Sequence, residues 1–404
     1  MKIKSFLKDV GGASRVTKLR GQTLNNASSK NLYIDPINAT AKALHPGPIE
    51  VVCTKVEEVS PTAKKYTFAP TNGVLPIFEA GQYVSFDLDI DGTKTTRPYS
   101  ICSAPYQAQG ENPFFEVTIR NGKKGTGYVS IWFYENVKEG DKFIVNLPFG
   151  HFNYEELRDS NNILALAGGS GITPFYSMAQ EIANGTLDVN LTILYGSVSH
   201  KDIILEKELK EITSKTDKVK FINVISGEGE ELQEGDEKGF ISRELIKKYS
   251  VESDPTNAKT SYFVCGPLVM YQFVEKELKA LNVPLRRIRM EVFGAPRDIS
   301  QAEGYPKENI NKVFKLTVRR GIDEVVIDAK ACEPLAVALE RAGIKNRTRC
   351  RSGECGFCRS KVVSGEFFVP KVGDGRRAAD KRFNYVHACS TYPLSDIVLE
   401  IPIL

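Results

Sequence analysis

The stretch that decides the C-terminal fold of this chain is Cys350-Arg-Ser-Gly-Glu-Cys355-Gly-Phe-Cys358. Its cysteines follow the spacing Cys-x4-Cys-x2-Cys, and a fourth, Cys389, comes about thirty residues later, which is the ligand spacing of a plant-type [2Fe–2S] cluster. Gly353 and Gly356 let the loop turn tightly and direct N–H groups at the sulfurs. A zinc site usually takes its ligands from two close pairs. We therefore favour the cluster over zinc or four unrelated buried thiols, and expect the chain to move single electrons.

Size and composition narrow the class of protein. A chain of 404 residues is too long for one ordinary domain, so two to four are expected. No apolar run is long enough to cross a bilayer, and the N-terminus lacks the apolar stretch of a secretory signal. Eight cysteines in this length do not suggest a disulfide scaffold. Because a thiolate cluster favours a reducing compartment, we expect a cytoplasmic protein.

The small net charge of +4 is unevenly spread along the chain. Residues 1–30 carry seven Lys or Arg against a single acid, Asp9. Neither this segment nor a second basic concentration has the density or aromatic interleaving of a nucleic-acid site. The second concentration is either solvated surface or a docking face for an acidic redox partner. It surrounds the cysteine loop and comprises Arg341, Lys345, Arg347, Arg349, Arg351, Arg359 and Lys361.

Two patterns of predicted elements precede the cysteine region. Between 47 and 155, short strands separated by turn signals indicate an antiparallel barrel; we expect strands at 49–56, 65–68, 83–88, 115–119 and 142–146. Between 156 and 293, apolar runs alternate with helical patterns, which indicates a parallel sheet; we expect strands at 163–167, 191–195, 220–225 and 262–265. A helix is predicted from Phe175 to a stop at Gly185, and another at 333–342.

The N-terminal 46 residues are harder to assign. No periodicity stands out in the first thirty. A short helix is predicted from Pro36, with Asp35 as its N-cap.

Two motifs in the barrel region fit a flavin nucleotide. Arg97-Pro98-Tyr99-Ser100 ends a strand-like stretch, and alternation along a strand places Arg97 and Tyr99 on one face. Together they offer a cation for phosphate, an aromatic plane and a small polar donor. Gly125-Thr126-Gly127-Tyr128-Val129-Ser130 precedes a predicted helix ending near Val137. A glycine-rich turn into a helix binds phosphate through free N–H groups, although an ordinary helix start looks the same.

Two further motifs lie in the parallel-sheet region. Gly168-Gly169-Ser170-Gly171-Ile172-Thr173-Pro174 stands between a buried strand and a helix, where bare backbone can approach a dinucleotide. Cys265-Gly266-Pro267 ends a later strand. A thiol there can face a nicotinamide ring or simply be a small buried hydrophobe.

The order of these motifs is more specific than any one of them. Over residues 47–404 it resembles the ferredoxin–NADP reductase superfamily, specifically three-module members with a C-terminal plant-type ferredoxin domain, such as phthalate-dioxygenase-type and hybrid-cluster-protein reductases. The resemblance implies a multidomain fold. Its parts are an antiparallel β-barrel flavin domain (47–155), an α/β parallel-sheet NAD(P)-binding domain (156–293), a linker (294–311) and an α+β, β-grasp [2Fe–2S] ferredoxin domain (312–404), after an unassigned extension (1–46).

The resemblance also implies roles for matching residues. Arg97 and Pro98 would belong to the flavin site with Tyr99 on the isoalloxazine, Ser100 near its reactive nitrogen, and Gly127 and Ser130 at the flavin phosphates. The nicotinamide nucleotide would be bound by Gly168, Gly169, Ser170, Gly171, Thr173 and Pro174, with Cys265, Gly266 and Pro267 beside its ring. Glu291, in Glu291-Val-Phe293, would lie near the flavin. Cys350, Cys355, Cys358 and Cys389 would ligate the cluster.

The choice of cofactors rests on smaller signals. Pro148-Phe149-Gly150-His151-Phe152 looks like the FAD-type members, so FAD is favoured over FMN. A 2′-phosphate wants clustered basic residues, and only His200 and Lys201 are available near 197–202, so NADH is favoured over NADPH. Cys53, Cys102 and Cys332 are interpreted as packing residues. His387 is expected on the same face as Cys389, to tune the cluster or to pack.

These features together predict an oxidoreductase. It would take hydride from NADH onto FAD and pass single electrons through the cluster to a partner redox protein. Two alternatives stay open: a ferredoxin-like carrier whose reductase half is unused, and a scaffold acting through the basic N-terminal segment. The final acceptor is open among an oxygenase component, a hybrid-cluster protein, a corrinoid enzyme and an anaerobic reductase.

Overall fold

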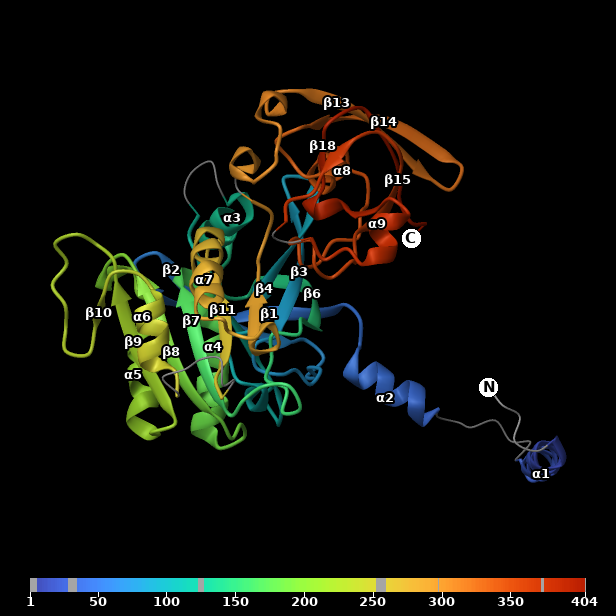
Figure 1. The fold of residues 1–404 in the computed structure, drawn as a ribbon, viewed down its shortest axis with the longest axis horizontal. Coiled ribbons are helices and arrows are strands. Elements are labelled where there is room, and N and C mark those ends of the chain that lie inside the picture. Colours follow the sequence, from blue (N-terminus) through green and yellow to red (C-terminus); the bar gives the residue numbers. More distant parts are fainter. Residues whose placement is uncertain are drawn as a thin grey trace. The chain divides into compact units, whose positions relative to one another are not determined.

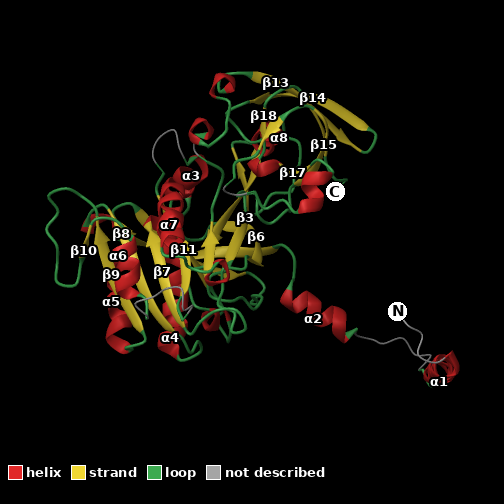
Figure 2. Ribbon diagram, viewed as in Figure 1, coloured by secondary structure: helices red, strands yellow, loops and turns green. Residues whose placement is uncertain are grey.

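The computed structural model describes residues 6–27, 35–122, 127–251, 259–296, 298–371 and 374–403. The chain forms two compact units, residues 1–44 and residues 45–404. The first unit is helical and the second contains three sheet-based modules (Figures 1 and 2).

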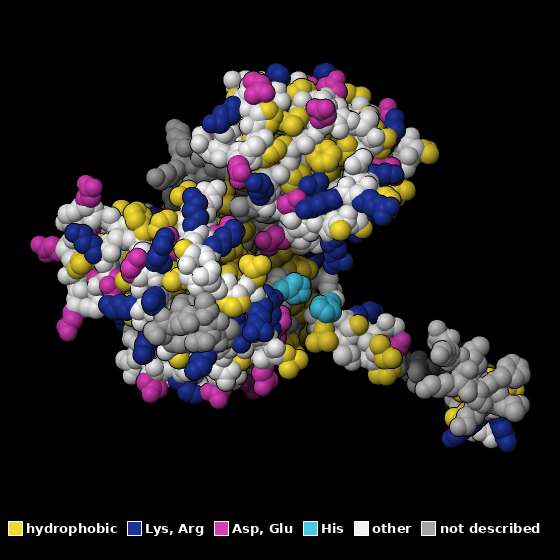
Figure 3. Space-filling model, viewed as in Figure 1, with side chains coloured by type: hydrophobic (Ala, Val, Ile, Leu, Met, Phe, Trp, Pro, Cys, Tyr) yellow, Lys and Arg dark blue, Asp and Glu magenta, His cyan; other side chains and the backbone are white. Residues whose placement is uncertain are grey.

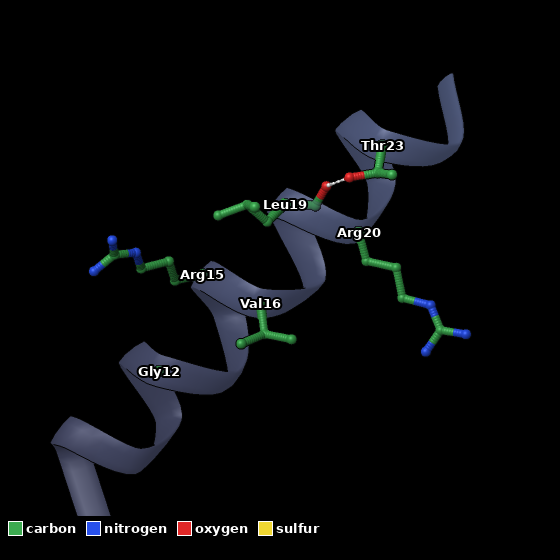
Figure 4. Close-up of a pocket in the computed structure, with 6 residues that line it drawn as sticks. All are labelled: Gly12, Arg15, Val16, Leu19, Arg20 and Thr23. Carbon is green, nitrogen blue, oxygen red and sulfur yellow. Dashed lines mark hydrogen bonds between the residues drawn. The ribbon is translucent and has the colours of Figure 1, made fainter. Parts of the chain in front are cut away.

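The N-terminal unit holds helices α1 (Phe6–Asn25) and α2 (Pro36–Leu44). Helix α2 begins as predicted, because the Asp35 carboxylate accepts a hydrogen bond from the Ile37 amide at 3.0 Å. Helix α1 was not predicted, because its apolar residues do not recur on one face. Figure 4 shows Arg15 and Arg20 extending away from different sides of α1, and the shallow groove drawn there is lined by this helix alone.

The first module of the second unit is a closed antiparallel barrel, as predicted. Its strands follow the order β4-β3-β6-β1-β2-β5, and an Ile101–Val117 bridge joins the two edges. The elements are β1 (Ile49–Ser60), β2 (Ala63–Pro70), β3 (Tyr83–Ile90), β4 (Thr93–Ser100), η1 (Pro105–Ala108), β5 (Phe115–Arg120), α3 (Tyr128–Asn136) and β6 (Lys142–Phe149).

Aromatic side chains fill the barrel. Phe133 of α3 inserts among Phe68, Phe86 and Tyr66, with ring centroids 5.0–6.4 Å apart and edge-to-face geometry. All four rings are fully buried, so α3 is fixed against the barrel by an apolar anchor.

The second module is a six-stranded parallel sheet in the order β10-β9-β8-β7-β11-β12, again as predicted. One buried cluster packs α4 and α5 on one face, and a second packs α6 and α7 on the other. The elements are β7 (Asn162–Gly168), η2 (Gly169–Ile172), α4 (Thr173–Asn184), β8 (Asn190–Ser197), η3 (His200–Asp202), α5 (Glu206–Lys215), β9 (Val219–Ile225), β10 (Glu237–Lys238), α6 (Arg243–Tyr249), β11 (Ser261–Cys265), α7 (Leu268–Ala280), η5 (Leu285–Arg287) and β12 (Ile288–Glu291).

A buried ion pair ties the parallel sheet to the segment that follows the barrel. Arg289 on β12 donates to Asp159 from Nε at 3.0 Å and from Nη2 at 2.6 Å. It also donates to the His151 carbonyl at 3.2 Å. The Asp159 side chain has no exposed surface, so this pair fixes the junction of the first two modules.

The third module is a mixed five-stranded sheet, order β14-β13-β19-β15-β17, with a separate β16-β18 pair. Helix α8 packs on the sheet to form the module's core, which matches the expected α+β fold. The elements, with the preceding segment, are η6 (Ile299–Gln301), η7 (Lys307–Asn309), β13 (Val313–Arg320), β14 (Asp323–Lys330), α8 (Leu335–Arg341), β15 (Arg359–Ser364), β16 (Phe367–Phe368), α9 (Ala378–Arg382), β17 (Tyr385–His387), η8 (Ala388–Ser390), β18 (Tyr392–Pro393) and β19 (Ile397–Glu400). None of the described helices has the length and apolar character needed to cross a membrane.

Candidate functional site

The cysteine loop between α8 and β15 brings three thiols close to the fourth on η8. Cys350, Cys358 and Cys389 are buried, whereas Cys355 is exposed, and none of the four is in a disulfide. The Cys355 amide donates to the Cys350 sulfur at 3.4 Å. The loop can fold this tightly because Gly353 and Gly356 adopt φ of 85° and 70°, in the left-handed region.

The four sulfurs form one continuous series of contacts, from Cys355 through Cys350 and Cys389 to Cys358. Cys350 is hydrogen-bonded to Cys355 and to Cys389, which lowers the pKa of Cys350, and Cys358 is hydrogen-bonded to Cys389, which lowers the pKa of Cys358. In the described part of the chain, no three metal-ligating side chains surround a single ion position. Four neighbouring thiolates, three from one loop and the fourth from a separate segment, fit a two-iron cluster with four cysteine ligands.

His387 packs against the cysteine loop. Its Nδ1 is hydrogen-bonded to the Gly353 carbonyl, and its ring is buried. A Cβ on Gly356 would lie 3.4 Å from His387 Nε2. The imidazole therefore contacts the backbone of the loop at both of its glycines, which is the packing role weighed from the sequence.

Strand β4 places the predicted flavin residues. Arg97 donates to the Thr95 hydroxyl at 2.9 Å and to the Thr96 carbonyl at 2.7 Å, and no carboxylate within the described ranges forms an ion pair with it. Burial, reinforced by the nearby Arg351, lowers the pKa of Arg97 to about 9, so it is still a cation at neutral pH. Pro98 is half-buried beside it. A half-buried cation without an acidic partner fits a phosphate ligand.

Tyr99 and the start of α3 complete this side of the site. The Tyr99 ring lies edge-on to Phe133 of α3, with centroids 5.7 Å apart. Gly127 precedes α3 with φ of 95°, and a Cβ there would lie 2.8 Å from the Ser130 hydroxyl oxygen. Ser130 donates to the Gly127 carbonyl at 2.9 Å. The first turn of α3 presents N–H groups of the kind that bind an anion; Gly125 and Thr126 lie outside the described residues.

The two nucleotide motifs meet at the carboxyl edge of the parallel sheet. Strands β7 and β11 are neighbours, with Ala167 opposite Cys265. A Cβ on Gly171 would lie 2.1 Å from the Cys265 carbonyl oxygen and 2.7 Å from the Gly266 amide. A Cβ on Gly168 would lie 3.1 Å from Pro267. The glycine-rich turn therefore needs bare backbone at Gly168 and Gly171 to pack against the Cys265-Gly266-Pro267 loop.

The other residues of the glycine-rich segment shape its turn. Gly169 has φ of 53° and lies beside the Arg120 guanidinium from the barrel. The Thr173 hydroxyl donates to the Ser170 carbonyl at 2.9 Å, and Pro174 stands in the first turn of α4. The turn therefore leads directly into the helix.

Ser100, Glu291 and Cys265, expected near the reacting rings, come together at the junction of the first two modules. Cys265 on β11 is opposite Glu291 on β12. Burial and the nearby Glu354 raise the pKa of Glu291 well above its usual value, and a hydrogen bond from Ser100 only partly offsets this. Glu291 Oε2 is buried without a hydrogen-bond partner among the described residues. Burial also raises the pKa of the Cys265 thiol well above its usual value, so burial disfavours the charged form of both groups.

The sequence missed residues that connect the modules. Arg120 of the barrel pairs with Asp202 of the second module at 3.2 Å. Tyr83 lies opposite Ser100 in the barrel register, and its ring is 5.8 Å from that of Phe149. Only Phe149 belonged to a motif, Pro148-Phe149-Gly150; the others had no local signal, because their partners are distant in sequence.

Family comparisons agree with this arrangement. Residues 50–154 match the family model of an oxidoreductase FAD-binding domain, residues 165–276 an oxidoreductase NAD-binding domain, and residues 320–394 a 2Fe-2S iron-sulfur cluster binding domain. Fold and site thus define a flavin- and nicotinamide-dependent iron–sulfur oxidoreductase. The chain belongs to the ferredoxin–NADP reductase superfamily, among its three-module members with a C-terminal ferredoxin domain.

Three similar proteins illustrate this membership. The glycine betaine monooxygenase reductase subunit of Chromohalobacter salexigens is 26% identical over 91% of this chain and 99% of its own. NADH-cytochrome b5 reductase 1 of Dictyostelium discoideum is 31% identical over 52% of this chain and 68% of its own. The solved phthalate dioxygenase reductase has a similar fold, with a TM-score of 0.62 and 22% identity, covering 88% of this chain and 98% of its own.

The activity follows from these three modules. The chain is an NAD(P)H-dependent reductase in which hydride from the nicotinamide reaches FAD, and single electrons then leave through the [2Fe–2S] cluster to a partner redox protein. The hard chemistry belongs to the cofactors, and the protein supplies binding, orientation and electrostatics.

Proposed function

We propose that this reductase serves an oxygenase component and that strand β4 is the element on which its electron path is built. One observation carries the second part of this proposal: β4 contacts both neighbouring modules. At its end, Ser100 reaches Glu291 of the nucleotide module. At its middle, the Thr96 hydroxyl donates to the Thr348 carbonyl of the cysteine loop at 3.0 Å.

The residues around β4 have separate roles in this proposal. Arg97 binds the flavin phosphates together with the turn at Gly127 and Ser130, and Tyr99 packs against the isoalloxazine. Glu291, whose burial favours its protonated form, lies next to Ser100. Cys265, Gly266 and Pro267 leave room for the nicotinamide ring rather than supplying a thiolate, while Gly168–Pro174 bind its phosphates. Cys350, Cys355, Cys358 and Cys389 hold the cluster.

The charges beyond β8 favour NADH over NADPH. His200 is within 2.7 Å of an Asp236 carboxylate oxygen and 3.7 Å of Glu230. Asp202 pairs with Arg120. Because carboxylates pair with His200 and Arg120, the segment offers a 2′-phosphate Lys201 rather than a cluster of unpaired basic side chains. Comparing flavin reduction by the two nucleotides tests this: a rate with NADPH equal to that with NADH would contradict it.

The partner-facing surface is smaller than the sequence suggested. Arg351 is buried against Glu340, Arg341 pairs with Glu333, and Arg359 pairs with Asp380. Lys345 and Arg347 are exposed, and in the described ranges neither has an ion pair.

We define the cluster-side patch as Lys345, Arg347 and Phe357, which line a shallow depression that reaches Cys358, with the paired Arg359 at its border. Figure 3 shows further Lys and Arg side chains over the same module near α9. A basic rim around an exposed aromatic ring suits an acidic partner surface.

The oxygenase partner is inferred from the relatives. The names of the C. salexigens reductase subunit and of phthalate dioxygenase reductase both refer to an oxygenase system. We propose a partner of the same class, reached in the cytoplasm, and domain limits of 47–155, 156–293 and 312–404 with 294–311 as the connecting segment.

Anaerobic mixing of the holoprotein with NADH tests the function. The flavin absorbance should fall first and the cluster absorbance second, and each NADH should reduce two equivalents of a one-electron acceptor, since hydride carries two electrons. Transfer to an acidic acceptor should slow as salt rises. If neither NADH nor NADPH bleaches the flavin, the reductase function is wrong. If the rate of transfer to the acidic acceptor does not depend on salt, only the acidic-partner proposal is wrong.

The N-terminal unit offers a second test. A scaffold that acts through residues 1–46 would lose partner association on their deletion while keeping flavin reduction. The reductase proposal instead expects both NADH oxidation and transfer to the partner to survive, because no residue of the site described above lies before residue 47.

A further inference from the structure

Side chains outside the cluster motif connect the cysteine loop to strand β4. The Thr96 and Thr348 hydroxyl oxygens are 2.7 Å apart. Arg351 donates to Glu340 from Nη2 at 2.9 Å and to the Thr95 hydroxyl from Nη1 at 3.4 Å. These contacts join β4 to the residues immediately around Cys350.

Arg349 contacts an aromatic ring on each side of this boundary. Its guanidinium carbon is 3.9 Å from the ring centroid of Phe149 on the barrel and 3.9 Å from that of Phe357 in the cysteine loop. No carboxylate pairs with it in the described part of the chain, and the side chain is half-buried. The planar cation is therefore held by two ring faces, an arrangement for which Arg is suited and Lys is not.

The two rings lie at functionally distinct places. Phe357 lies between Cys355 and Cys358 in sequence. Phe149 ends β6 and contacts Tyr83, which is opposite Ser100 in the register. A continuous series of packed side chains thus runs from the cysteine loop to the end of strand β4.

The segment that precedes the third module does not act as a loose tether. Tyr305 donates to the Ala331 carbonyl at 3.0 Å, and its ring lies 5.3 Å from that of Phe368. Ile299 and Tyr305 pack with Tyr392 in a small buried cluster. Since this segment is packed onto the ferredoxin module, little free chain is left for a swinging motion.

We propose that Arg349, clamped between Phe149 and Phe357, is the positioning residue that keeps the cysteine loop docked on the flavin barrel, so that internal electron transfer occurs from a fixed rather than a swinging module. The proposal rests on the flavin-to-cluster direction of transfer. It assigns Arg349 and Arg351 to the inner side of the loop and leaves Arg347 on the outer side. The loop can then receive electrons on one side while a partner occupies the other.

Rapid mixing of Arg349→Ala holoprotein with NADH separates the two steps. Flavin bleaching should stay within about twofold of wild type, because Arg349 touches neither nucleotide loop. Cluster bleaching should slow by about tenfold or more, the scale expected for losing a desolvated cation–π contact. Arg349→Lys keeps the charge without the planar stack, so it should resemble Arg349→Ala and exclude a charge-only role.

Hydrogen exchange on the same holoproteins provides a readout independent of turnover. In Arg349→Ala, the backbone amides of residues 93–100 and 345–349 should exchange faster than in wild type. Those of residues 162–184 should exchange at the wild-type rate. The matched control is Arg382→Ala, because Arg382 stacks 5.6 Å from Phe383 within its own module; neither measurement should change. Cluster bleaching at the wild-type rate in both Arg349 variants would overturn the proposal, as would equal slowing of flavin and cluster, which would indicate a general structural role.

Discussion

Adding one methyl group at Gly171 should separate the two nucleotide loops. The new Cβ would lie 2.1 Å from the Cys265 carbonyl oxygen, whereas ordinary contact begins at 3.4 Å. The loops must therefore move apart by about 1.3 Å, the difference between these distances. Cys265 belongs to a strand paired on both sides, with β7 and β12, so most of the movement falls on the glycine-rich turn.

Two consequences are expected for Gly171→Ala. Overpacking of this kind costs about 1–3 kcal/mol of folding stability. A displacement of about 1 Å in a substrate-positioning element costs roughly 100-fold in rate. Single-turnover loss of flavin absorbance on mixing with NADH measures the rate, and thermal unfolding measures the stability.

The matched control is Gly196→Ala at the same edge of the sheet. Gly196 pairs with Gly168 in the register, but its Cβ would meet the Ala167 carbonyl oxygen at an ordinary 3.6 Å. It should reduce flavin within about twofold of wild type, as expected for a substitution without steric conflict. The reasoning fails if Gly171→Ala bleaches flavin at the wild-type rate, or if both variants are equally slow.

Three other perturbations have defined outcomes. Arg289→Ala leaves buried Asp159 without its cation and should cost about 3–5 kcal/mol in urea unfolding; a loss below about 1 kcal/mol would contradict this. Although burial opposes it, a hydrogen bond from Arg376 helps to hold the pKa of Asp374 at about 2. The folded-state pKa is thus depressed, so about 1–2 kcal/mol of stability should be present above pH 4 and be lost as pH falls toward 2; a flat acid profile of unfolding would refute it. Cys389→Ser should abolish the cluster absorbance while NADH still bleaches the flavin; an intact cluster spectrum would exclude Cys389 as a ligand.

Much of the fold could be predicted because its signals are local. The parallel sheet of the second module follows from apolar runs alternating with helical patterns. The end of helix α4 at Gly185 and the start of α2 after Asp35 follow from capping chemistry. Helix α1 was not predicted because it lacks such local signals. Its 20 residues include three glycines and no regular apolar face, so neither propensity nor periodicity indicated a helix.

The same distinction between local and long-range signals applies to the functional site. The glycine-rich turn, Arg97–Ser100 and three of the four cysteines each lie in a short stretch, so the sequence by itself determined the kinds of cofactor: a flavin, a nicotinamide nucleotide and an iron–sulfur cluster. Only the tertiary structure decided how the groups face one another: that Ser100 meets Glu291, and that Arg349 and Arg351 turn inward although Arg347 stays exposed. Side-chain direction depends on partners hundreds of residues away, and the burial that sets charge and contact exists only once the modules have packed.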